Sequence, residues 1–173
     1  TPVGIGIGWT AAGIALCMLL ATYWHLPAAR DGVRRTAIAF LIGDIALWSA
    51  IGLVTLDGSA DGIVPTVAAV LVVTAALSRS AQLPFHHWLP ATLAAPTPVS
   101  ALLHAGAVNA GALLVLRLQP VYDVAVVSAL AITAGTATML YGAAVMLAKP
   151  DVKGALAHST MAQMGFMILT CGL

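Results

Sequence analysis

The chain has 173 residues, of which 61% are hydrophobic and only 8% are charged, and its formal net charge is +1. A soluble domain carries roughly 25% charged residues, so this composition and a mean hydropathy of +1.01 exclude an ordinary soluble protein. The basic residues form no cluster of the kind that indicates nucleic-acid binding, and no nucleic-acid partner is expected. Several uncharged runs approach or exceed the roughly 20 residues with which a helix crosses a bilayer, which predicts a chain embedded in lipid.

The hydropathy pattern predicts six helical segments joined by short turns. They are expected at about residues 3–25, 36–56, 63–83, 97–118, 122–147 and 152–172. In lipid every backbone polar group must be satisfied within the protein, which favours helices for such runs. The expected fold class is therefore all-α transmembrane. We expect residues 1–173 to form one transmembrane domain, the middle portion of a longer chain, because the sequence starts without Met and almost inside a helix.

The distribution of basic residues predicts the orientation in the membrane. If the first segment runs inward, the cytoplasmic connections carry six of the seven Lys and Arg residues, namely Arg30, Arg34, Arg35, Arg79, Lys149 and Lys153. The outer connections carry only Arg117. This asymmetry is typical of a multi-pass membrane protein, whose cytoplasmic loops are enriched in positive charge.

The connection between the third and fourth segments, "SRSAQLPFHHWLPATLAAPTPVSALLHAG" (residues 78–106), contains four prolines, at Pro84, Pro90, Pro96 and Pro98. Proline breaks a helix because it lacks the backbone N–H and clashes with the preceding turn. Inside a membrane a broken helix is tolerated only where its backbone is buried in protein or lines a polar cavity. The prolines therefore predict an interrupted segment that reaches the interior of an ion-translocating bundle.

Five ionisable residues in the segments are candidates for ion translocation: Asp44, Arg79, His104, Lys153 and His158. A charged side chain at the bilayer centre costs about 2.5–3.5 kcal/mol on insertion scales, so each needs a partner or water. His104, with Ser100 one turn earlier, is the best candidate proton carrier because the ordinary pKa of histidine is about 6.5. Structural interpretations also exist. Asp44 would then link two helices and His104 would be a packed interior residue, while Arg79 and Lys153 would be interfacial.

Neither a metal site nor covalent catalysis is expected. His86 and His87 are adjacent, so their side chains would diverge by about 100° on a helix, and the other histidines are distant in sequence. No Cys or Glu completes a zinc-binding spacing. Neither of the two cysteines has a recognisable base nearby, so we assign no catalytic residue.

Two motifs carry a family resemblance. "SAQLPFHHWLPATLAAPTPVSALLHAG" and "KPDVKGALAHSTMAQMGF" resemble the antiporter-like membrane subunits of respiratory complex I and of multisubunit cation/proton antiporters. The first matches nearly throughout residues 80–105. The second matches at Asp151, Lys153, Leu156, Ala157, Ser159, Thr160, Gln163 and Gly165. The resemblance implies that the six segments are similar to the fifth to tenth helices of a fourteen-helix core in the bacterial inner membrane.

Within that family, one branch is most similar. "HAGAVNAGALLVLRLQPV" (104–121) and "STMAQMGFMILTCGL" (159–173) resemble the membrane subunit of DAB-type inorganic-carbon accumulation systems. That resemblance implies a large zinc-binding partner subunit, similar to a carbonic anhydrase, with zinc in the partner and no cofactor in this chain.

The sequence departs from the complex I pattern at two positions. Where the resemblance would place a glutamate in the fifth helix stands Thr10, and where it would place the lysine of the broken helix stands Arg79. Arginine, with a pKa above about 12, does not release its proton in proteins. Asp44 matches the aspartate of the sixth helix, so we expect Asp44 and Arg79 to form a fixed ion pair and His104 to be the titrating group.

Three hypotheses about function follow. The first is a proton- or cation-conducting membrane subunit that energises inorganic-carbon uptake with a soluble zinc-protein partner. The second is a proton-translocating subunit of complex I or of a multisubunit cation/proton antiporter, which Thr10 and Arg79 disfavour. The third is a membrane anchor that docks a soluble partner and conducts no ions. We expect a transporter subunit that is not an enzyme on its own; if it is complex I-like, it is part of an NADH:quinone oxidoreductase.

Overall fold

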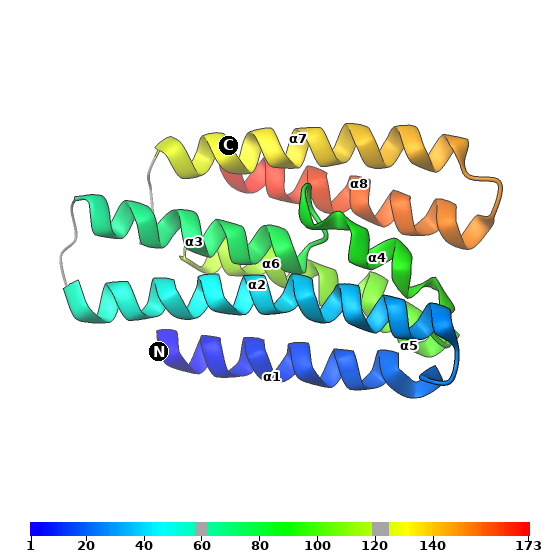
Figure 1. Cartoon of the computed structure of the whole chain (residues 1–173). Helices are drawn as coiled ribbons and strands as arrows, with labels where there is room; N and C mark the ends of the chain where they lie inside the picture. The colour runs from blue at the N-terminus through cyan, green and yellow to red at the C-terminus, as the bar shows by residue number, and fades with distance from the viewer. Residues whose placement is uncertain (58–61, 119–124) are drawn as a thin grey trace.

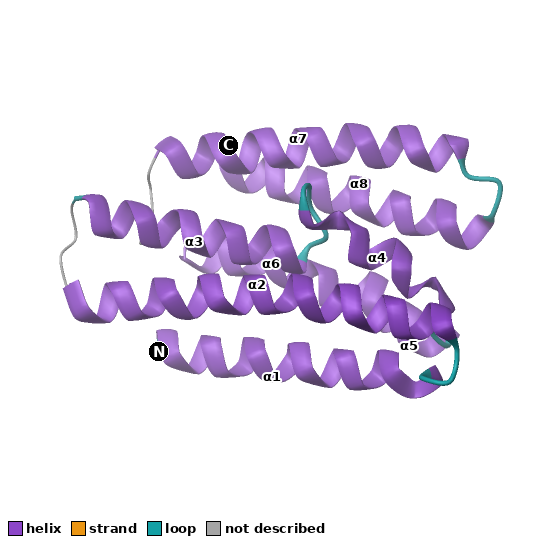
Figure 2. Ribbon diagram, in the orientation of Figure 1, coloured by secondary structure: helices purple, strands orange, loops and turns teal. Residues whose placement is uncertain are grey.

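The computed structural model describes residues 1–57, 62–118 and 125–173, which are almost entirely helical and contain no strand (Figures 1 and 2). The all-α fold predicted from the sequence is confirmed. The longer helices are α1 (Pro2–Leu20), α2 (Pro27–Asp57), α3 (Ile63–Arg79), α5 (Thr97–Ala105), α6 (Ala110–Leu118), α7 (Ala125–Ala148) and α8 (Val152–Gly172). Short helical turns complete the chain, at η1 (Ala21–Tyr23), η2 (Phe85–His87), α4 (Trp88–Ala91), η3 (Thr92–Ala94) and η4 (Ala107–Asn109).

The helices run along a common direction, with α2 packed between α1 and α3, and α8 packed along α7 (Figure 1). Small residues bring α7 and α8 into close contact. A Cβ added to Gly135 would lie 2.7 Å from the Gly165 carbonyl oxygen, and one added to Gly165 would lie 2.7 Å from the Gly135 carbonyl oxygen. Such close backbone approach is how small residues promote helix association in membranes, where the hydrophobic effect between helices is weak.

Four helical stretches of the described chain are long and apolar enough to cross a membrane: Pro2–Tyr23, Pro27–Leu56, Thr97–Leu118 and Ala125–Ala148. The expected segments agree in number and approximate position with the helices, with the start of the fifth, at residue 122, outside the described residues, but some boundaries differ. The second begins at Pro27, nine residues earlier than predicted, because Pro27 opens the helix and Asp31 pairs with Arg35 one turn later at 2.7 Å. The third ends at Arg79, four residues earlier than predicted.

The connections of α1 to α2 and of α7 to α8 lie at the same end of the bundle (Figure 1). That end carries five basic residues, Arg30, Arg34, Arg35, Lys149 and Lys153. Arg79 was also assigned to the cytoplasmic connections, but α3 ends about halfway along the bundle, so Arg79 lies inside it (Figure 1). The bias that predicted the orientation is therefore five against one.

The interruption predicted from the prolines is present after α3. Ala81 has a positive φ of 52°, and Gln82 N–H donates to the Leu77 carbonyl at 2.9 Å. Together these form a Schellman ending, in which a residue in the left-handed region turns the chain out of the helix. The short turns η2, α4 and η3 then carry the chain along the remaining half of the bundle to α5 (Figure 1).

Side chains from several elements satisfy the backbone groups released at this break. Trp88 Nε1 donates to the Ser78 carbonyl at 3.0 Å, and Gln82 Nε2 donates to the Ser80 carbonyl at 2.9 Å. Leu83 N–H donates to the Thr138 hydroxyl of α7 at 3.0 Å. These donors and acceptors replace water in the membrane interior, where an unpaired backbone group costs several kcal/mol.

A second interruption, which the sequence reasoning did not predict, divides the expected segment 97–118 at Gly106. There α5 ends, and η4 leads into α6. Ser80 donates a hydrogen bond to the Val108 carbonyl at 2.6 Å, so the two breaks are joined. Gly111 allows this approach, because a Cβ at that position would collide with the Ala76 carbonyl oxygen and with Ser80 Oγ.

Gly111→Ala is expected to destabilise the protein by about 1–3 kcal/mol, because the added methyl group overpacks the contact between α6 and the end of α3. The measurement is the thermal unfolding of the full-length protein in detergent. Gly52→Ala is the matched control: nothing lies within 4 Å of a Cβ at that helical position. It is expected to be neutral or stabilising by up to about 1 kcal/mol. Equal stability of the two variants would contradict the close contact.

Candidate functional site

Arg79, the last residue of α3, is buried at the first break with only 3% of its surface exposed. Its Nη2 lies 3.3 Å from Asp44 Oδ1 and 3.1 Å from the Trp9 carbonyl oxygen. Its Cζ lies 4.5 Å from the centre of the Trp9 ring and 4.1 Å from that of Phe40. Two aromatic faces, a carboxylate and a carbonyl therefore surround a cation that never loses its charge. The pairing of Asp44 with Arg79 expected from the sequence is present.

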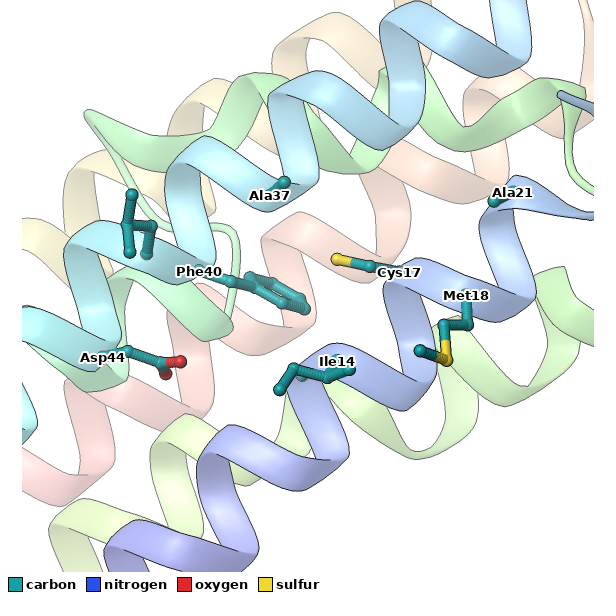
Figure 3. Close-up of a pocket in the computed structure, with 9 residues that line it drawn as sticks. Ile14, Cys17, Met18, Ala21, Ala37, Phe40 and Asp44 are labelled. Atoms are coloured by element: carbon teal, nitrogen blue, oxygen red, sulfur yellow. The ribbon is translucent and has the colours of Figure 1, made fainter.

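Gly13 makes room for the guanidinium on the α1 side. A Cβ at Gly13 would lie 2.9 Å from both Nη atoms of Arg79. On the other side of the pair, Asp44 lines an open cavity of about 400 Å³ between α1 and α2, together with Gly13, Cys17 and Phe40 (Figure 3). Asp44 thus faces this cavity, whereas its partner Arg79 is buried and does not line it.

Thr10, at the position where the resemblance would place a glutamate, accepts a hydrogen bond from Trp48 Nε1 at 3.1 Å. It joins α1 to α2 without contributing a charge. Asp44 is thus the carboxylate that these two helices bring to Arg79.

His104, at the end of α5, contacts α8 just before the second break. Its Nδ1 lies 3.0 Å from the hydroxyl oxygen of Thr160. The sequence reasoning expected Ser100 to orient this ring. In the described part of the chain the hydrogen-bond partner of this ring is Thr160 of α8 instead. The family motif contains Thr160, and that match was the signal that could have identified it.

Lys153, at the start of α8, holds the end of the interrupted connection. Its Nζ donates to the Leu93 carbonyl, and to the Ala95 carbonyl at 3.1 Å. Lys153 and Thr160 are seven residues apart, so they lie within about 20° of each other around the helix.

His158 lies on a different face of α8. It is five residues from Lys153, which places it about 140° around the helix. Its Nδ1 is 2.8 Å from the Gly154 carbonyl oxygen of the preceding turn. The ring of His86 lies 5.0 Å from that of Tyr141 of α7. A route from His104 along α8 would therefore follow the face of Lys153 and not that of His158.

The four prolines of the interrupted connection have different positions. Pro84 precedes η2, and Pro90 lies in α4. Pro96 caps α5, and Pro98 lies in its first turn, where proline does not disturb the helix.

Within residues 1–57, 62–118 and 125–173, no three His, Cys, Asp or Glu side chains lie close enough together to hold a metal ion.

An interrupted helix with a buried arginine–aspartate pair at its break, inside an all-helical bundle, is the architecture of an ion-translocating class of membrane protein. A family model described as the transmembrane region of NADH:quinone oxidoreductase and Mrp antiporter proteins matches residues 3–173, and the chain belongs to this family. It is a multi-pass membrane protein, consistent with the bacterial inner membrane expected from the sequence.

Relatives of this chain come from different complexes. It is 35% identical to NADH-quinone oxidoreductase subunit L of Mycobacterium tuberculosis over 182 residues, covering 96% of this chain and 29% of that protein. It is 39% identical to the probable inorganic carbon transporter subunit DabB1 of Halothiobacillus neapolitanus over 188 residues, covering 96% of this chain and 34% of that protein.

Among solved structures, a chain of the Mrp complex from Dietzia sp. superposes with a TM-score of 0.91 at 35% sequence identity. The match covers 99% of this chain and 20% of that chain. The chain thus spans about a third or less of the length of these relatives.

Asp44→Asn and Arg79→Gln are each expected to destabilise the protein by about 3–5 kcal/mol, because each leaves an uncompensated buried charge. The double variant is expected to be milder than the sum of the two. The measurement is a double-mutant cycle on the amount and thermal stability of the assembled full-length protein. The exposed pair of Asp31 and Arg35 is the matched control and should contribute less than about 1 kcal/mol. Additive losses at the buried pair would argue against coupling.

Proposed function

We propose that this chain is the central part of a proton- or cation-conducting membrane subunit that energises inorganic-carbon uptake together with a soluble, zinc-binding partner subunit. The relation to DabB1, at 39% identity over 96% of the chain, supports this choice of complex. The "HAGAVNAG" run, which begins at His104, adds the resemblance noted in the sequence. In this proposal the zinc belongs to the partner, and the chain itself holds no cofactor.

One observation supports the proposal most strongly. The permanently charged Arg79 lies at the first break and the titratable His104 lies beside the second, and a hydrogen bond from Ser80 to Val108 joins the two breaks. Arg79 is held by Asp44 and two aromatic rings, so it supplies a permanent positive charge. His104 lies four residues before Val108, whose carbonyl accepts from Ser80, the residue after Arg79. A proton carrier at a helix interruption is the arrangement expected of a transport path, because broken helices expose polar backbone inside the membrane.

Buried polar atoms near the first break favour conduction over a purely structural anchor. Gln82 Oε1 and His86 Nδ1 are buried and have no hydrogen-bond partner in the described part of the chain. Such atoms in protein interiors are normally satisfied by water. These two polar atoms lie in the connection that packs against α7. A hydrated path at this place would satisfy them, and a non-conducting anchor offers no reason for polar groups there.

A second candidate is a proton-translocating subunit of a complex I or Mrp-type assembly. The relation to subunit L of NADH-quinone oxidoreductase and the TM-score of 0.91 with the Mrp complex chain favour it. The surroundings of Arg79 argue against this second candidate. Gly13 and the two rings fit a planar guanidinium, whereas a proton-exchanging lysine would need a site that stabilises its neutral form.

The partner distinguishes these two candidates. Metal analysis and subunit identification on the complex purified from native membranes should find a large zinc-containing partner. A set of oxidoreductase subunits in its place would support the second candidate.

His104→Ala is expected to reduce ion-coupled inorganic-carbon uptake by about 100-fold or more, because it removes the proton carrier. Expression and partner binding should be unchanged. His104→Lys should retain part of the activity, since a buried lysine still titrates. The measurement is uptake by membrane vesicles that contain the full-length protein and its partner, with an imposed proton gradient.

His25→Ala is the matched control for this experiment, because His25 is exposed in the connection after η1. It should leave uptake unchanged. Wild-type uptake by His104→Ala, with normal dependence on the gradient, would instead favour the non-conducting membrane anchor.

A further inference from the structure

The contact between His104 and Thr160 determines which of the two imidazole nitrogens carries the hydrogen in the neutral ring. The two side chains meet at 3.0 Å between Nδ1 and Oγ1. The Thr160 hydroxyl also donates to the Leu156 carbonyl of the preceding turn at 3.0 Å. A hydroxyl has one hydrogen, and a carbonyl oxygen only accepts, so the hydrogen of Thr160 is committed to Leu156.

The remaining role of Thr160 Oγ1 toward His104 is that of an acceptor. His104 Nδ1 must then carry the hydrogen of this bond, and in the neutral ring the other nitrogen, Nε2, carries the lone pair. We infer that Thr160 is a positioning residue that fixes His104 in the Nδ1–H tautomer, so that the ring takes up and releases a proton at Nε2 alone. The transport part of this inference rests on the proposed function, whereas the tautomer does not.

The proton balance of this step is simple. The Nε2 lone pair of the neutral ring accepts one proton and gives an imidazolium with hydrogen on both nitrogens. Loss of the same proton from Nε2 restores the neutral ring. Throughout, Nδ1–H remains bonded to Thr160, and the Thr160 hydroxyl keeps its own hydrogen on Leu156. A relay in which a proton enters at one nitrogen and leaves at the other is therefore excluded while Thr160 holds this geometry.

The surroundings of the pair support a fixed geometry. Thr160 is branched at Cβ, which restricts its χ1 angle in a helix, and its bond to Leu156 selects one of the allowed rotamers. Lys153 lies on the same side of α8 as Thr160, two turns earlier. Its ammonium donates to the Leu93 and Ala95 carbonyls, which holds it at the end of the interrupted connection and leaves Thr160 as the hydrogen-bond partner of His104 on α8.

The tautomer is tested by nitrogen-15 NMR of the histidine-labelled full-length protein in its membrane complex, with His104→Gln identifying the His104 signals by difference. The wild type should show Nδ1–H in the neutral ring, and Thr160→Ser, which keeps the hydroxyl, should show the same. Thr160→Val has nearly the same shape but no acceptor, so its His104 should shift toward the Nε2–H form. Thr170→Val is the matched control, because Thr170 lies exposed on the same helix and bonds only its own turn.

Uptake is measured on the same variants. Thr160→Val should lower ion-coupled uptake by about 10-fold or more, whereas Thr160→Ser and Thr170→Val should stay close to wild type. An Nε2–H ring in the wild type, or an unchanged tautomer in Thr160→Val, would overturn the inference. A third outcome is that Thr160→Val alters the tautomer but keeps full uptake, while His104→Ala loses uptake. This outcome would overturn the inference about Thr160 and leave the proposed function intact. Full uptake by His104→Ala would overturn the proposed function, while the NMR result would still decide the tautomer.

Discussion

A helix that ends inside a membrane leaves backbone groups that lipid cannot satisfy, and this requirement determines the packing around the end of α3. The bonds come from Trp88 of α4 and Thr138 of α7, while Ser80 donates across to the second break. Each unpaired group would cost several kcal/mol. The position of the break is therefore set by three packed elements together, and a shift of α3 by one residue would separate all three sets of partners.

The same ending places Arg79 where a cation is favoured. The last turn of a helix carries partial negative charge from its free carbonyls, which stabilises a nearby positive group. The Asp44 carboxylate and two aromatic rings add to this, and together they offset the desolvation of a guanidinium that is only 3% exposed. Because arginine keeps its proton, the result is a constant charge at mid-bundle and not a switch. In the proposed function the proton is therefore carried by another group, His104, which lies one turn before Val108, the acceptor of the Ser80 hydrogen bond.

Much of this arrangement could be predicted from the sequence, because its signals are local. The prolines identified the interrupted segment, whereas the pair of Asp44 and Arg79, 35 residues apart, was expected from the family resemblance. The end of α3 was misplaced because the turn is made by Ala81 in the left-handed region, where glycine would have been the recognisable signal. The break at Gly106 was missed because a single glycine in an apolar run is ordinarily compatible with a continuous helix. The Thr160 contact depends on which face of α8 meets α5, which no short-range pattern specifies.

The two breaks place the permanent charge of Arg79 and the titratable ring of His104 only a few residues apart along a hydrogen-bonded path. Arg79 precedes Ser80 directly, Ser80 donates to the Val108 carbonyl, and His104 lies one turn before Val108. Gly111 brings the backbones so close that neither side can move without the other, since even a methyl group does not fit between them. Interiors packed to this density respond by shifting as units and do not deform gradually. The turn that holds Arg79 and the end of α5 that holds His104 are therefore linked through Ser80 and Val108.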